Sequence, residues 1–160
     1  MPDFFTYQSP IGLIVTELND NSISRMTFSE KIQETDLIDQ SLKNEVRAQL
    51  EAYFNGKLFQ FDLPLTPSGS NFQKDVWKNL QAIEYGQQLT YSELAIKLGD
   101  KNLVRAVGGA NSRNPIAIVV PCHRVVGANN KLVGYAGGIW RKKWLLQHEL
   151  NHRPVSNTLF

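Results

Sequence analysis

The stretch from residue 58 to residue 70, LFQFDLPLTPSGS, most constrains the fold, because it separates two parts of the chain with different periodicity. Two prolines and a small polar end are typical of a connection between structural units. We therefore predict an N-terminal domain over residues 1–68, linker included, and a C-terminal domain over residues 69–153. A chain of 160 residues is long enough to bury a core without disulfides or a structural metal.

The N-terminal domain is predicted to be a small antiparallel meander followed by one helix. Short β-rich runs between Phe4 and Glu30 are broken at Ser9-Pro10, at Gly12 and at the turn Asn19-Asp20-Asn21. Farther along, apolar residues recur at i, i+4 spacing, and a glycine stands where a helix should end. The apolar residues are Leu42, Val46, Leu50 and then Tyr53 and Phe54, and the glycine is Gly56.

The C-terminal domain is predicted to be mainly helical. Apolar periodicity indicates a helix over residues 72–83, and TYSELAIKLG indicates a second, with Thr90 or Ser92 as its N-cap and Gly99 as its end. NLVRAVGGAN indicates a third, opened by Asn102 and closed by its glycines. Two short helices joined by a short turn are typical of a helix-turn-helix, here of winged-helix-like type. The fold class is therefore α+β.

The rest of this domain contains a run of apolar β-formers, a glycine-rich stretch and a last periodic segment. We predict a strand over residues 116–120, a loop over residues 127–138 and a final helix over residues 140–150. The strand would carry the chain directly to the single cysteine, Cys122, which lies within IVVPCHRVVG.

Basic residues are concentrated in the second half of the chain, although the formal net charge is only +2. Between residues 97 and 143 the only acid is Asp100, and the bases are Lys97, Lys101, Arg105, Arg113, Arg124, Lys131, Arg141, Lys142 and Lys143. This asymmetry favours a phosphate-binding surface, with a solvated basic face as the alternative.

Several classes of protein are disfavoured. No apolar run approaches the ~20 residues of a membrane span, and the N-terminus lacks a basic start followed by an apolar segment. One cysteine cannot form an internal disulfide or a cysteine-rich zinc site. We expect a cytoplasmic protein without a metal or another cofactor.

The pair Cys122-His123 raises the question of thiol chemistry, because a thiolate is the reactive form and a neighbouring base is a usual way to produce it. Adjacent residues of a regular strand point to opposite faces, so contact between Cys122 and His123 requires either a break in the strand or a bridging water. Pro121 gives a reason for such a break, because it cannot donate a hydrogen bond to a neighbouring strand. Glu149 is the candidate acceptor that would orient the histidine. The alternative is an inert cysteine that packs as a small apolar residue.

The run RAVGGANSRNPIAIVVPCHRVVG, together with GYAGG and WLLQHE, resembles the signature of the O6-alkylguanine-DNA alkyltransferases. The resemblance covers roughly residues 70–150, and its motifs follow in the family's order and spacing. It implies DNA repair in which the protein takes the alkyl group from guanine O6, and possible activity on O4-methylthymine, and in which each molecule acts once. The cysteines that bind zinc in some relatives are missing from the N-terminal third.

The resemblance also implies roles for individual residues. Cys122 matches the cysteine that accepts the alkyl group, His123 the base that deprotonates it through a water, and Glu149 the acid that orients this base. Asn114 matches the asparagine that holds the active-site turn, and it also suits the turn before Pro115. Tyr135 matches the tyrosine that donates a hydrogen bond to the departing guanine, and we expect Pro121, Val125 and Ala136 at the substrate pocket.

The DNA partner implied by the resemblance is a duplex containing alkylated guanine, bound by a monomer through the minor groove, with the target base flipped out. Arg105 matches the arginine that fills the gap left in the stack, and Tyr91 the residue that pushes on the phosphate of the flipped nucleotide. We further expect Ser92, Gly108 and Gly109 to contact DNA. Some members carry a serine at the position of Ala136 and a methionine at that of Asn111. We expect both residues to line the pocket or its rim, so the range of alkyl groups that this protein accepts is left open.

Other classes of function remain as alternatives. A helix-turn-helix regulator explains residues 88–111 but gives Cys122, His123 and Glu149 no purpose, and it predicts a sequence-specific operator. A cysteine hydrolase predicts turnover. A lesion-recognition protein without alkyl transfer would have its cysteine replaced, and a methyl-sensing regulator would need a second cysteine and a sensor domain.

Overall fold

The computed structural model describes residues 1–36 and 40–154, and its N-terminal part is the expected antiparallel meander. Strands β1 (Asp3–Ser9), β2 (Gly12–Asn19) and β3 (Ser22–Ser29) form a sheet in the order β1-β2-β3. The β2–β3 turn is made by Asp20 and Asn21, both with positive φ, the conformation that a tight hairpin of this kind requires.

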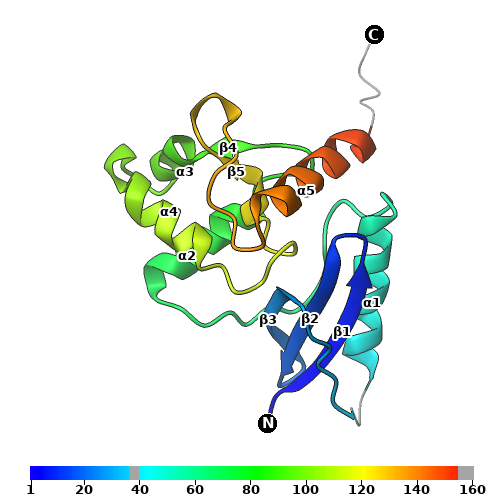
Figure 1. Cartoon of the computed structure of the whole chain (residues 1–160). Helices are drawn as coiled ribbons and strands as arrows, with labels where there is room; N and C mark the ends of the chain where they lie inside the picture. The colour runs from blue at the N-terminus through cyan, green and yellow to red at the C-terminus, as the bar shows by residue number, and fades with distance from the viewer. Residues whose placement is uncertain (37–39, 155–160) are drawn as a thin grey trace.

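Helix α1 (Ser41–Phe54) packs on this sheet (Figure 1). Val46 and Leu50 are fully buried, as their spacing predicted, and the Tyr7 and Phe54 rings stack at the contact between helix and sheet. Gly56 has a φ of +74°, and its N–H donates to the Tyr53 carbonyl, so this glycine follows the end of the helix as expected.

The free edge of β3 is covered by two segments that are distant in sequence. The Ile23 N–H donates to Pro64 O and the Thr66 N–H donates to Ile23 O, so the connection between the two parts pairs with the sheet. Farther along the strand, the Met26 N–H donates to Pro115 O and the Ala117 N–H donates to Met26 O. The segment that leads to Cys122 is thus hydrogen-bonded to the N-terminal sheet, and the exposed edge is removed.

The remaining helices group apart from the sheet (Figure 1). They are α2 (Asn71–Gln81), α3 (Tyr91–Lys97), α4 (Val104–Ser112) and α5 (Ile139–His152), with a 3-10 turn η1 (Lys101–Leu103) between α3 and α4. Thr90, and not Ser92, caps α3, because its hydroxyl accepts from the Glu93 N–H in a capping box. The α+β fold class is confirmed.

Two local predictions in this part were wrong. Asn102 does not open α4: it lies in η1, where Asp100 accepts its N–H, and α4 begins at Val104. The helix also continues through its glycines to Ser112, since helical hydrogen bonds in the turns on either side offset the conformational cost of glycine.

The strand predicted over residues 116–120 was also wrong. Only an isolated bridge at Ile116 is extended, and the chain then turns, with Ile118 at a φ of +70°. Pro115 and Pro121 restrict the backbone at the two ends of the segment. The β-branched residues between them are explained by their burial in the core and not by a strand. Cys122 begins the 3-10 turn η2 (Cys122–Arg124), and β5 (Val125–Val126) then pairs in parallel with β4 (Leu89–Thr90).

A short 3-10 turn, η3 (Ala128–Asn130), lies in the predicted loop that leads to α5. Across residues 1–36 and 40–154, no helix has both the length and the apolar character that a membrane span needs.

Candidate functional site

Cys122 lies at the start of η2 and is 7% exposed. Asn114 holds the preceding turn: its Nδ2 donates to Val120 O at 2.8 Å and to Ile116 O at 3.2 Å, and its Oδ1 accepts from the Ile116 N–H at 3.0 Å. One side chain therefore satisfies three backbone groups that a strand would have paired with a neighbour. Because η2 is a 3-10 turn, the expectation that Cys122 and His123 point to opposite faces of a strand does not apply.

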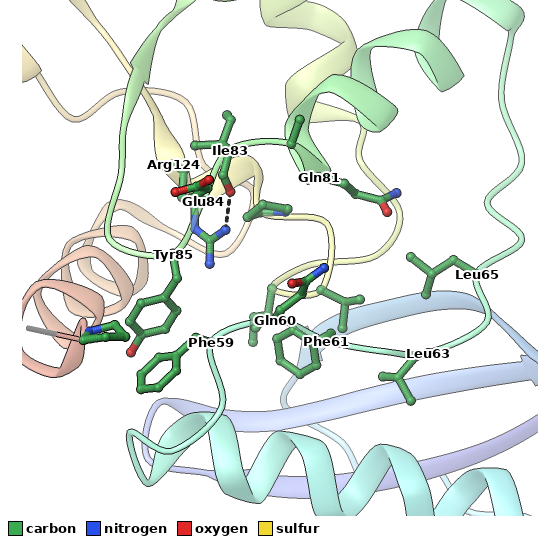
Figure 2. Close-up of a pocket in the computed structure, with 15 residues that line it drawn as sticks. Phe59, Gln60, Phe61, Leu63, Leu65, Gln81, Ile83, Glu84, Tyr85 and Arg124 are labelled. Carbon is green, nitrogen blue, oxygen red and sulfur yellow. Dashed lines mark hydrogen bonds between the residues drawn. The ribbon is translucent and has the colours of Figure 1, made fainter. Parts of the chain in front are cut away.

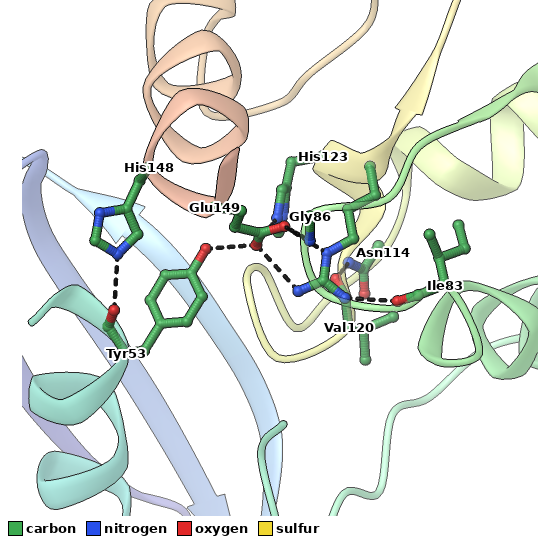
Figure 3. A network of polar contacts seen from close by, with 9 residues as sticks. Tyr53, Ile83, Gly86, Asn114, Val120, His123, His148 and Glu149 are labelled. Atoms are coloured by element: carbon green, nitrogen blue, oxygen red, sulfur yellow. Dashed lines mark hydrogen bonds and ion pairs between the residues drawn. The ribbon is translucent and has the colours of Figure 1, made fainter. Parts of the chain in front are cut away.

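The carboxylate of Glu149 lies at the centre of a buried polar network that includes His123, the residue after Cys122 (Figure 3). His123 Nε2 lies 2.7 Å from Glu149 Oε2, which also accepts from Tyr53 Oη at 2.7 Å. Arg124 donates from Nε to Oε1 at 2.8 Å and from Nη2 to Oε2 at 3.0 Å, and the Gly86 N–H donates to Oε1 at 3.3 Å. His123, Glu149 and Tyr53 are at most 1% exposed.

This network decides the charge states of its members. Burial by itself would raise the pKa of Glu149, but the charges and hydrogen bonds of His123 and Arg124 outweigh it and hold that pKa well below its usual range. Burial lowers the pKa of His123, against the opposite effect of Glu149, so the imidazole is neutral at pH 7. The Nε2–H then donates to the carboxylate. His123 Nδ1 is buried and finds no hydrogen-bond partner among the residues that the structure describes.

The thiol of Cys122 is neutral at rest, since burial raises its pKa. Asn114 and the ammonium group of Lys142 act in the opposite direction. Lys142 is fully buried, donates to Val133 O at 2.7 Å, and has a pKa lowered by burial to about 8. A positive charge is thus held close enough to stabilise a thiolate once it forms.

A cavity of about 110 Å³ opens beside the thiol. Cys122, Asn114, Tyr135 and Ala136 line it, whereas Pro121 and Val125 do not. Tyr135 is only partly buried as a residue, but its hydroxyl oxygen is buried and has no hydrogen-bond partner in the described part of the chain. This hydroxyl is therefore free to donate a hydrogen bond to a group that enters the cavity.

A larger cavity, of about 540 Å³, lies beside the connection between the two parts (Figure 2). Phe59, Phe61 and Tyr85 line it, together with Pro121 and Arg124. Cys122 is not part of its lining, so this space is separate from the thiol.

The residues expected to contact DNA lie on helices α3 and α4. Arg105 and Ser92 are exposed, on α4 and α3, and Gly108 and Gly109 lie partly exposed in α4. Tyr91 is partly buried, and its hydroxyl donates to Val133 O at 3.3 Å.

Sequence reasoning missed several members of the site. Arg124 and Lys142 were assigned to a basic surface, but both are buried, because each has acceptors inside the molecule. Tyr53 was predicted only as part of an apolar helix face. No periodicity or motif in the sequence distinguishes a buried lysine from an exposed one.

Comparisons with known proteins agree with this geometry. Residues 71–151 match a family model described as 6-O-methylguanine DNA methyltransferase, DNA binding domain, and residues 4–67 match the ribonuclease-like domain of the same family. The chain therefore belongs to the 6-O-methylguanine DNA methyltransferase family, and the resemblance seen in the sequence is confirmed.

Individual relatives match over almost the whole chain. A methylated-DNA–protein-cysteine methyltransferase from Methanosarcina barkeri is 45% identical, over 91% of this chain and 95% of the relative. One from Mycolicibacterium paratuberculosis is 44% identical, over 100% and 99%. The crystal structure of Mycobacterium tuberculosis O6-methylguanine methyltransferase superposes with a TM-score of 0.86 at 41% identity, covering 100% of this chain and 99% of that one. The same protein in complex with DNA gives 0.83 at 40% identity, over 94% of each chain.

The Glu149 network predicts a specific effect of Glu149→Gln. At pH 7 the variant should lose about 3 kcal/mol in the free energy of unfolding, because Arg124 remains buried without its counter-charge. The folded-state pKa of Glu149 lies below that of the unfolded chain, so its contribution is present at neutral pH and is lost as the pH falls below about 4.3. Urea unfolding should show the gap to wild type narrowing between pH 7 and pH 3.

The control for this prediction is Glu84→Gln, at an exposed carboxylate, which should change stability by no more than about 0.5 kcal/mol. A gap between wild type and Glu149→Gln that is equal at both pH values would contradict the ionised, paired state of Glu149.

Proposed function

We propose that this protein repairs DNA by direct reversal, transferring the alkyl group of O6-methylguanine irreversibly to its own Cys122. One observation carries the assignment to Cys122: the only cysteine of the chain is followed by a histidine whose Nε2 is fixed by a buried carboxylate and whose Nδ1 has no hydrogen-bond partner within residues 1–36 and 40–154. The family to which the chain belongs supports the reaction, since its relatives are named methylated-DNA–protein-cysteine methyltransferases.

The reaction begins with deprotonation of the thiol. Neutral His123 accepts the Cys122 proton at Nδ1, through a water as in the family. Meanwhile its Nε2–H continues to donate a hydrogen bond to Glu149. The imidazolium that forms is stabilised by the adjacent carboxylate, and the thiolate by Lys142. The raised pKa of the resting thiol limits reaction with other electrophiles before the substrate is bound.

Transfer is an in-line displacement at the alkyl carbon. A lone pair of Cys122 Sγ forms the new C–S bond as the C–O6 bond breaks. The electron pair of the broken C–O6 bond moves onto the guanine. The buried Tyr135 hydroxyl donates a hydrogen bond to the base and stabilises the charge that develops on it. The product is a thioether, which no group of the site hydrolyses, so each molecule acts once. Ala136, which lines the cavity, belongs to our proposed set of substrate-binding residues, and so do Pro121 and Val125, which do not line it but flank the turn that carries Cys122.

The bound DNA is proposed to be a duplex, approached by α4 through the minor groove. A Cβ on Gly108 would lie 3.9 Å from Tyr91 Cδ1, an ordinary contact, so packing inside the protein does not demand this glycine. Two glycines in a helix cost about 1 kcal/mol each, which a close approach to a DNA backbone explains. The exposed Arg105 would fill the gap left by the flipped base, and Tyr91 and Ser92 would contact its phosphate.

The same proposal includes the arrangement of the chain. The boundary between residues 68 and 69 is supported by the separate family matches on either side of it. A winged-helix-like helix-turn-helix, a monomer in solution and a cytoplasmic location belong to the proposal as well, together with the absence of a metal or another cofactor from the reaction.

Intact-mass measurement tests the transfer directly. After incubation with a duplex containing O6-methylguanine, we expect the protein to gain the mass of one methylene, since a methyl group replaces the thiol hydrogen, with one equivalent of DNA repaired. Cys122→Ser should show no gain. Multiple turnovers would favour a hydrolase, and binding without an adduct would favour a regulator or a lesion-recognition protein.

Arg105→Ala tests base flipping. The variant should repair O6-methylguanine in duplex DNA at least about tenfold more slowly, because an unfilled gap leaves the unstacking energy of a few kcal/mol uncompensated. Reaction with the free base O6-benzylguanine should stay within about twofold of wild type, because Arg105 is exposed on α4 and does not line the cavity. Lys74→Ala, at an exposed cation of α2 outside the basic group of residues 97–143, is the control and should leave both rates within about twofold of wild type. Equal losses on the two substrates would contradict the role of Arg105.

A further inference from the structure

The cavity beside Cys122 has one wall that comes from the N-terminal sheet. Met26, Thr27 and Phe28 of β3 line it opposite the loop that carries Tyr135. The Phe28 and Tyr135 rings meet edge to face, with centroids 6.4 Å apart. The N-terminal sheet therefore forms part of the cavity itself, beyond serving as a structural brace.

Arg141 connects this wall to the opposite loop. From α5, its Nε donates to Ile11 O at 2.7 Å, in the β1–β2 turn, and its Nη1 donates to Gly137 O at 2.9 Å. Its guanidinium also lies over the Phe28 ring, 4.5 Å from the centroid. One planar cation thus fixes the ring, the sheet turn and the loop in a single arrangement, which a lysine could not reproduce.

The fit between the two walls is tight. A Cβ on Gly137 would approach both Phe28 Cδ2 and Tyr135 Cε2 to 2.8 Å, which is closer than packed atoms allow. Gly137 therefore packs directly against both rings, and the space beside the thiol depends on the position of Phe28.

We propose that Phe28 is a specificity-determining residue that limits the size of the alkyl group transferred to Cys122, and that Arg141 is the residue that positions it. The inference rests on the proposed function. The reacting carbon must touch Cys122 Sγ, so any atoms attached beyond that carbon need room within the same small cavity, whose wall includes Phe28. A methyl group needs none of this additional room, whereas a benzyl group needs the space of a ring.

The test compares two substrates within one DNA sequence. Duplexes containing O6-methylguanine or O6-benzylguanine are reacted with excess protein, and the ratio of the benzyl rate constant to the methyl rate constant is measured. Phe28→Leu should raise this ratio about tenfold, and Phe28→Trp should lower it, since small changes in pocket volume alter discrimination by at least this factor. Arg141→Lys should raise the ratio as well, because Phe28 and the loop lose their common support.

Matched controls make the same chemical changes elsewhere on the sheet. Phe4→Leu on β1 and Arg25→Lys on β3 alter residues that do not line the cavity, and both should leave the ratio within about twofold of wild type. An unchanged ratio in Phe28→Leu and Phe28→Trp, including one in which both rates fall together, would overturn the inference. Failure of wild type to form any methyl adduct on Cys122 would instead overturn the proposed function, so the two failures are distinguishable.

Discussion

The site depends on one buried carboxylate. Glu149 accepts five hydrogen bonds, from Tyr53, His123, Arg124 and the Gly86 backbone, so a single charge joins α1, the segment after α2, the η2 turn and α5. Removing this carboxylate leaves Arg124 buried without its counter-charge, which costs far more than an exposed ion pair contributes. The histidine beside the nucleophile is thereby fixed in one orientation, and its burial keeps it neutral.

The turn that carries Cys122 is held from the opposite side by the N-terminal part of the chain. The edge of β3 pairs with Pro115 and Ala117, and Asn114 satisfies the backbone groups that this turn leaves without a strand partner. The N-terminal sheet therefore supports the thiol and, through Phe28, also forms a wall of the cavity beside it. Its contribution to the proposed reaction is to hold the site in place and to limit its volume.

The fold class and the helix positions could be predicted because apolar periodicity and capping residues act locally, as at Leu50 and Thr90. The turn at Ile118 could not, because its β-branched residues reflect burial, and the hydrogen bonds that replace a strand come from Asn114 and β3. The candidate site followed from a motif, PCHRV, and from one distant acid. Arg124 and Lys142 were misassigned, since sequence spacing does not reveal which cations have buried acceptors.

The central claim is that burial keeps the His123 ring neutral, while the hydrogen bond to Glu149 fixes its proton on Nε2 and its lone pair on Nδ1. Nitrogen-15 NMR of the imidazole of His123 in unreacted protein tests this claim most directly. The account predicts a proton on Nε2 and none on Nδ1. Because burial lowers the pKa of His123, it also predicts that the ring is still mostly neutral at pH 6.5, where an ordinary histidine, with a pKa of about 6.5, is half protonated. A ring protonated on both nitrogens at pH 7, or one with its proton on Nδ1, would contradict it.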